Sequence, residues 1–134
     1  MEVQYLAVIV ATVVAVAYSA IYYYVLDKQV TALRATKIRK KADTRTTASP
    51  NKMVIEIVRT FALVLVMAYV VNWLRLQHVE QALMVALWLW VGFPAVLFAG
   101  LVIHERFPTK LAVIHAADWL AKMLIIACII ILWP

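Results

Sequence analysis

Four long apolar stretches alternate with three polar connections along the chain. Each stretch is long enough to cross a bilayer as a helix, which takes about 20 residues. We therefore predict an all-α polytopic integral membrane protein, in which one membrane domain (residues 1–134) forms a four-transmembrane-helix bundle. The expected spans are about 5–26, 53–74, 82–103 and 111–133.

The composition supports a membrane protein over a soluble one. Hydrophobic residues make up 66% of the chain, charged residues only 15%, and the mean hydropathy is +0.91. A soluble domain of this size could not bury so much apolar surface. The first span lacks the basic start and the small-residue cleavage pattern of a signal peptide, so we expect it to be retained.

Basic residues are concentrated in the connection over residues 27–52, which holds eight of the 13 lysines and arginines. We expect this loop to face the lipid surface, where it either binds anionic lipid, at about 1 kcal/mol per residue, or acts only as a topology signal. No aromatic residue interrupts the basic run to stack on bases, so we expect no nucleic-acid partner. The densest part of the loop contains Lys37, Arg39, Lys40 and Lys41.

The distribution of charge between loops predicts the orientation. The third connection adds two basic residues, Arg106 and Lys110, whereas the second holds only Arg75. By the positive-inside rule, the first and third connections are cytoplasmic and both termini are outside.

Ionisable residues interrupt the last span. His115, Asp118 and Lys122 are spaced by three and four residues, which places them on one helical stripe. An ionisable residue at such a depth costs about 3 kcal/mol on insertion scales, so it needs a partner or water.

The second span can supply partners. Glu56 and Arg59 enter from the same side of the membrane, and Arg59 and Asp118 lie at a similar depth, roughly 9 to 12 Å from the helix ends. We expect these two residues to meet. The charges of the cluster sum to zero, which favours a closed structural network, although a relay site has the same sequence pattern. The predicted buried polar cluster comprises Glu56, Arg59, His115, Asp118 and Lys122.

Other chemistry has little support in the sequence. His104, Glu105, His115 and Asp118 lack a recognised metal-ligand spacing, so we expect no metal site. No Ser–His–Asp order, P-loop or dinucleotide fingerprint is present, and we therefore predict no catalytic residue, no cofactor and no enzyme activity.

Two further features bear on helix packing. Pro94 removes a backbone donor and is expected to kink the third span near Trp90. Small residues repeat every four positions, a pattern that favours close helix contacts and predicts a homo-oligomer or a membrane partner subunit. These residues are Ala11, Ala15 and Ser19 in the first span and Ala95 and Ala99 in the third.

The last fifty or so residues resemble a bacterial family of small four-helix membrane proteins, domain of unknown function seventeen sixty-one. The similarity rests on the stretch W-x-W-x-G-F, the short turn into K-L, and the closing tryptophan. The corresponding residues are Trp88, Trp90, Gly92, Phe93, Lys110, Leu111 and Trp133. The resemblance implies the four-helix architecture and a bacterial cytoplasmic membrane. It implies no mechanism, because the family has no established activity.

Two functional hypotheses follow. In the first, the bundle lets protons, ions or a small solute permeate past the polar cluster. In the second, the protein is a non-catalytic accessory or scaffold subunit, and the cluster only locks two helices together.

The charge bias between loops generates a topology prediction. Cysteines introduced at Thr47 and Gln77 should be labelled from opposite sides of the membrane, with Gln77 reached from outside intact cells. Labelling of position 47 in intact cells by an impermeant reagent would contradict the orientation.

Overall fold

The computed structural model describes residues 3–27, 29, 32 and 50–134. The basic residues Lys37, Arg39, Lys40 and Lys41, together with most of the 27–52 connection, lie outside the described residues.

Every regular element in the described part of the chain is a helix. Four helical spans are each long and apolar enough to cross a membrane, with 21 to 26 residues per span. At about 1.5 Å per residue these spans reach or exceed the roughly 30 Å of a bilayer core. The predicted fold class is thus confirmed, and the protein is an integral membrane protein with four spans. Its elements are α1 (Tyr5–Val25), α3 (Pro50–Trp73), α4 (Val79–Trp90), η1 (Val91–Ala95), α5 (Val96–His104) and α6 (Thr109–Leu132).

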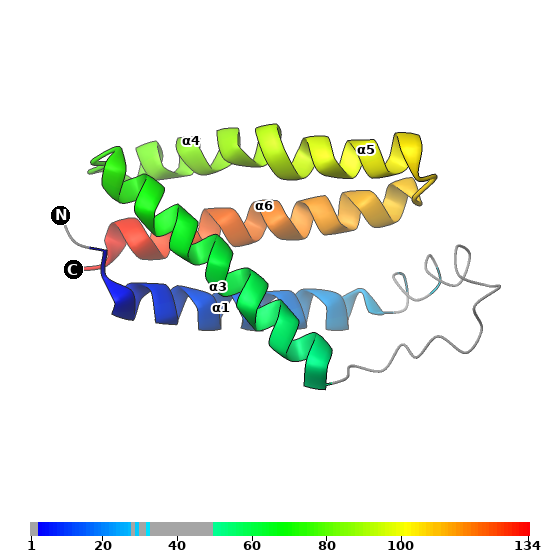
Figure 1. The fold of residues 1–134 in the computed structure, drawn as a ribbon, viewed down its shortest axis with the longest axis horizontal. Coiled ribbons are helices and arrows are strands. Elements are labelled where there is room, and N and C mark those ends of the chain that lie inside the picture. The colour runs from blue at the N-terminus through cyan, green and yellow to red at the C-terminus, as the bar shows by residue number, and fades with distance from the viewer. Residues whose placement is uncertain (1–2, 28, 30–31, 33–49) are drawn as a thin grey trace.

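Helix α6 is the centre of the bundle. It contacts α1 and α3 on one side and α4, η1 and α5 on the other (Figure 1). The continuous span from α4 to α5 packs mainly against α6, while α3 crosses over α1 at a steep angle. Because the number of spans is even, the two chain ends lie together at one end of the bundle.

The core is built largely from small side chains. Alanines from all four spans pack together with a few larger residues, and most large apolar side chains point outward, where lipid would cover them. Membrane helices associate by close packing of small residues, since burying large apolar groups gains little when the solvent is itself apolar. The buried cluster comprises Val8, Ala11, Ala15, Val64, Met67, Ala68, Ala82, Ala86, Met123, Ile126 and Ala127.

The third span is irregular at the position that the sequence indicates. Pro94 lies inside the π-helical segment η1, which starts directly after Trp90. Proline lacks the N–H that would bond the carbonyl four residues earlier, and a wider turn accommodates that loss. The indole of Trp90 donates a hydrogen bond of 2.8 Å to the backbone oxygen of Ala116 and ties this segment to α6.

The packing of small residues predicts that replacing alanine by leucine lowers stability at a buried position and not at an exposed one. Ala15 is fully buried in the core, whereas Ala99 is exposed. Ala15→Leu should lower the free energy of unfolding by about 1–3 kcal/mol through overpacking. Ala99→Leu, the matched control, should leave the thermal unfolding of the detergent-solubilised protein nearly unchanged. Equal melting temperatures for the two variants would show that α1 does not pack as described.

Candidate functional site

The centre of the site is an ion pair within α6. Asp118 and Lys122 lie one helical turn apart, and each side chain is only 2% exposed. The Lys122 Nζ atom is 3.6 Å from Asp118 Oδ2 and 3.3 Å from Glu56 Oε1 of α3. One ammonium group is therefore shared by carboxylates from two helices, which offsets part of the cost of removing all three charges from water.

Helix α1 supplies hydroxyl groups to the same carboxylate. The Ser19 hydroxyl lies 3.0 Å from Asp118 Oδ1 and 3.3 Å from Oδ2, so it donates to a carboxylate already paired with Lys122. Tyr23, one turn further along α1, interacts electrostatically with the same carboxylate. Asp118 thereby joins α1 to α6.

Arg59 lies at the outer edge of the cluster. Its side chain is 56% exposed, and its Nη1 atom is 3.2 Å from Glu56 Oε2. The guanidinium also lies over the Trp119 ring, 5.8 Å from the centroid. The expected contact between Arg59 and Asp118 is corrected here: the described ion pairs join Arg59 to Glu56 and Asp118 to Lys122.

His115 joins the cluster through an intermediate. Its Nδ1 atom forms a short hydrogen bond with the Tyr23 hydroxyl, and Tyr23 in turn interacts electrostatically with Asp118. The His115 ring stacks on Phe98 of α5, with centroids 6.0 Å apart, and makes a tilted contact with Phe107. The imidazole is thus held in an aromatic environment, apart from the ion pair itself.

These contacts form one connected series of ionisable and hydroxyl groups. It runs from exposed Arg59 through half-buried Glu56 to Lys122 and Asp118, and then through Tyr23 to His115. The Arg59 guanidinium stays charged, but the carboxylate, amine, phenol and imidazole groups of the series can bind and release protons, and the short contacts between them are those along which a proton can move. Three of the five predicted residues are in direct contact around Lys122, and the other two are attached at the ends.

Sequence reasoning missed Ser19 and Tyr23 as site residues. Ser19 belongs to the small-residue repeat that is expected to serve helix packing, and Tyr23 lies in a run of tyrosines, residues that are frequent at membrane interfaces. Their spacing of four residues puts both on one face of α1, at a depth similar to that of Asp118 in α6. This combination of spacing and depth is the sequence feature that could have identified Ser19 and Tyr23 as partners of Asp118.

Metal chemistry finds no support in the arrangement. Within the described part of the chain, no three His, Cys, Asp or Glu side chains come together closely enough to hold a metal ion.

The shared ammonium predicts a specific pattern of stability. Lys122→Met should lower the free energy of unfolding by about 3–5 kcal/mol, because it leaves the buried Asp118 carboxylate without its counter-ion. The double variant Asp118→Asn/Lys122→Met should recover much of this loss. Arg59→Ala, which removes an exposed charge, should cost at most about 1 kcal/mol.

Denaturant unfolding in mixed micelles measures these differences. Additive losses in the double variant would mean that Asp118 and Lys122 do not interact.

Comparison with known proteins gives a family. A family model described as a protein of unknown function (DUF1761) matches residues 6–131, and so extends the resemblance of the last fifty residues to nearly the whole chain. No curated protein and no solved structure matches the chain. The chain therefore belongs to the DUF1761 family, whose function is unknown.

Proposed function

We propose that the bundle passes protons, and that the Asp118 carboxylate is the group that accepts and releases them. The observation that carries this proposal is the buried ion pair of Asp118 and Lys122, each 2% exposed inside a membrane-spanning helix. Ionisable groups are rare in such helices and usually mark a proton or ion pathway. In this role the protein is not an enzyme.

Protons suit the cluster better than ions or solutes. Its members approach one another at hydrogen-bonding or ion-pair distances of 3.0 to 3.6 Å, which leaves no space for a hydrated ion between them. A proton needs only a continuous set of donors and acceptors. The cavity described below lies at the other end of the bundle and does not adjoin the cluster.

The end of the bundle with the basic loop offers the entrance. Glu56 is 38% exposed and Arg59 more so, and both are near the start of α3, where the 27–52 connection joins it. With the orientation inferred from loop charges, this entrance faces the bacterial cytoplasm and both termini are outside.

Toward the termini the pathway meets a layer of apolar side chains. Val8, Val64 and Ile126 are fully buried there and offer no proton-binding group. Passage across the whole membrane therefore requires water to enter this layer transiently. The Thr60 hydroxyl could hold such a water molecule, because it is buried and makes no hydrogen bond to any described residue.

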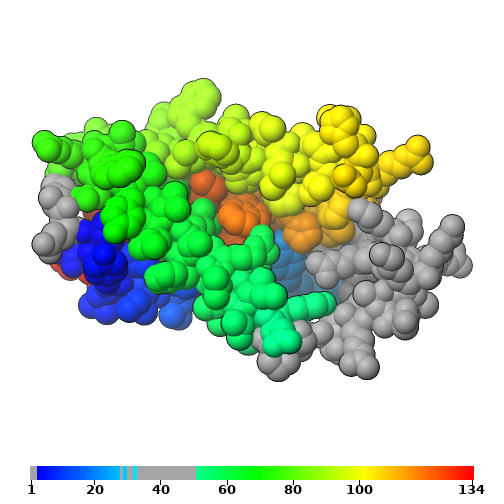
Figure 2. Space-filling model, in the orientation of Figure 1, coloured from blue at the N-terminus to red at the C-terminus, as the bar shows by residue number. Residues whose placement is uncertain are grey.

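The alternative is an accessory subunit, and one observation favours it. In Figure 2 part of α6 remains visible between α3 and the span formed by α4 and α5. A helix of a second copy or of a partner protein would cover this opening, and the polar cluster would then only hold α1, α3 and α6 together. In both roles the protein contacts the bilayer, and anionic lipid at the basic loop remains part of the proposal.

Proton flux distinguishes the two roles. Proteoliposomes containing the wild-type protein should dissipate an imposed pH gradient, as followed with an entrapped pH-sensitive dye. Asp118→Asn should reduce the rate at least tenfold, because the amide cannot take up a proton in the relay. Its helix content and monodispersity should be retained, because Lys122 keeps Glu56 as its counter-ion.

Glu80→Gln is the matched control, since Glu80 lies in the first turn of α4 at the opposite end of the bundle. It should leave the flux unchanged. Wild-type flux no greater than that of protein-free vesicles would contradict proton passage by this chain alone and favour the accessory role.

A further inference from the structure

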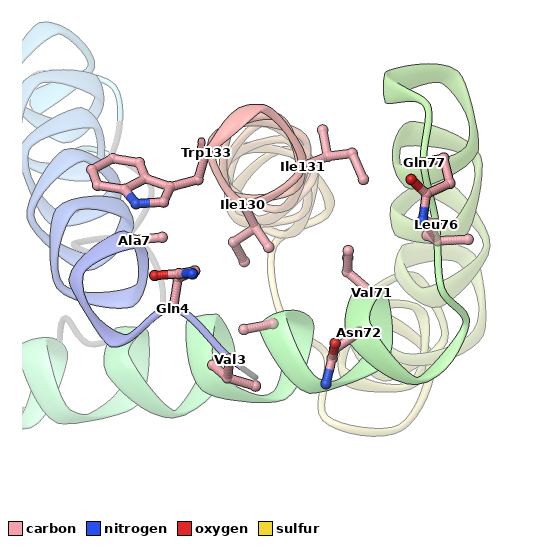
Figure 3. Close-up of a pocket in the computed structure, with 11 residues that line it drawn as sticks. Val3, Gln4, Ala7, Val71, Asn72, Leu76, Gln77, Ile130, Ile131 and Trp133 are labelled. Carbon is pink, nitrogen blue, oxygen red and sulfur yellow. The ribbon is translucent and has the colours of Figure 1, made fainter. Parts of the chain in front are cut away.

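A cavity of about 260 Å³ lies at the end of the bundle where α1 begins and α6 ends (Figure 3). Its floor is apolar and belongs to the core: Ala7, Ala68 and Val71 are buried. Ile130 of α6 points into the same space. The cavity is therefore formed by three different helices and is distinct from the polar cluster at the other end.

Three carboxamide side chains line the cavity above this floor. Gln4 precedes α1, Asn72 lies in the last turn of α3, and Gln77 belongs to the turn before α4. The Trp133 ring closes one side, next to Gln4. Apolar walls with a few convergent polar groups are the usual composition of a small-molecule site.

The hydrogen bonds of the lining leave ligand-binding capacity. The Gln77 Nε2 atom donates to the backbone oxygen of Arg75 at 3.4 Å, so its carbonyl oxygen is the acceptor left for a ligand. The Gln4 side chain lines the cavity and is exposed, and its amide can both donate and accept. A head group that both donates and accepts could bind to both side chains.

We propose that this cavity binds a small uncharged amphiphile, such as a primary amide or alcohol with a short alkyl tail. None of the described lining residues carries a charge, so a carboxylate or ammonium ligand would lose its hydration without gaining a counter-ion. At roughly 30 Å³ per water molecule, the volume corresponds to about nine waters, or a ligand of about that many non-hydrogen atoms. The tail lies on Ala7 and Ala68, and the head lies among the carboxamides.

The ester carbonyls of a phospholipid supply the hydrogen-bond-accepting part of this chemistry next to an alkyl chain, so a lipid and a free amphiphile are two sources of a ligand for this site. Binding of either ligand is independent of proton passage, because no residue of the polar cluster lines the cavity.

Hexanamide is the probe that tests this site. In protein labelled with 5-fluorotryptophan, the Trp133 signal is assigned by its loss in Trp133→Phe. Hexanamide should shift this signal saturably, whereas the signal of exposed Trp88 should not move. Hexanoate, of the same length but charged, should have no saturable effect at neutral pH.

Two variants test whether the shift of the Trp133 signal arises from binding in the cavity. Ala7→Phe fills the floor and should abolish the saturable shift. Gln4→Leu, which lies before α1 and outside the core, should fold normally and weaken hexanamide binding roughly fivefold through the loss of one hydrogen bond.

The measurement is made in nanodiscs and in a lipid-free amphipathic polymer. A saturable shift in both media supports a free amphiphile as the ligand. A saturable shift only in the lipid-free polymer supports the same site with a phospholipid as its occupant, because the lipid of the nanodisc then competes with hexanamide. No saturable shift in either medium, or a shift of equal affinity in wild type and Gln4→Leu, would overturn the proposal.

Discussion

An ammonium group in the middle of an apolar helix is the constraint on which the bundle depends. Lys122 cannot remain unpaired in α6, and Asp118, one turn away, is itself a buried charge. The two groups need additional partners, and neighbouring helices provide them: Glu56 from α3 and Ser19 from α1. The central position of α6, in contact with every other span, follows from this need as much as from apolar packing.

Much of the fold could be predicted because length and hydropathy determine it. An uninterrupted apolar stretch long enough to cross the bilayer must satisfy its backbone internally, and a helix does so. The stripe of His115, Asp118 and Lys122 could likewise be predicted from the helical period, as could the irregularity at Pro94. All of these are local properties of a single helix.

The pairing between helices could not be predicted from depth alone. Arg59 and Asp118 lie at comparable depth, but residues adjacent in a helix point about 100° apart, and Arg59 is next to the buried Thr60. Its side chain therefore turns toward the outside of the bundle, while the long stem of Lys122 brings the ammonium to Glu56. Ser19 and Tyr23 were missed for a related reason: which face of α1 meets α6 depends on the packing of all four spans.

The arrangement of the whole bundle depends on the buried ion pair that Lys122 forms with Asp118 and Glu56. Solid-state NMR of the protein in lipid bilayers, with ¹⁵N at lysine Nζ and ¹³C at the aspartate and glutamate carboxyl carbons, tests it most directly. Through-space correlations should connect the Lys122 nitrogen, assigned by its loss in Lys122→Met, to the carboxyl carbons of both Asp118 and Glu56, with the nitrogen shift of a charged ammonium. A Lys122 nitrogen that correlates with neither carboxyl carbon, or one with the shift of a neutral amine, would show that this ion pair does not form.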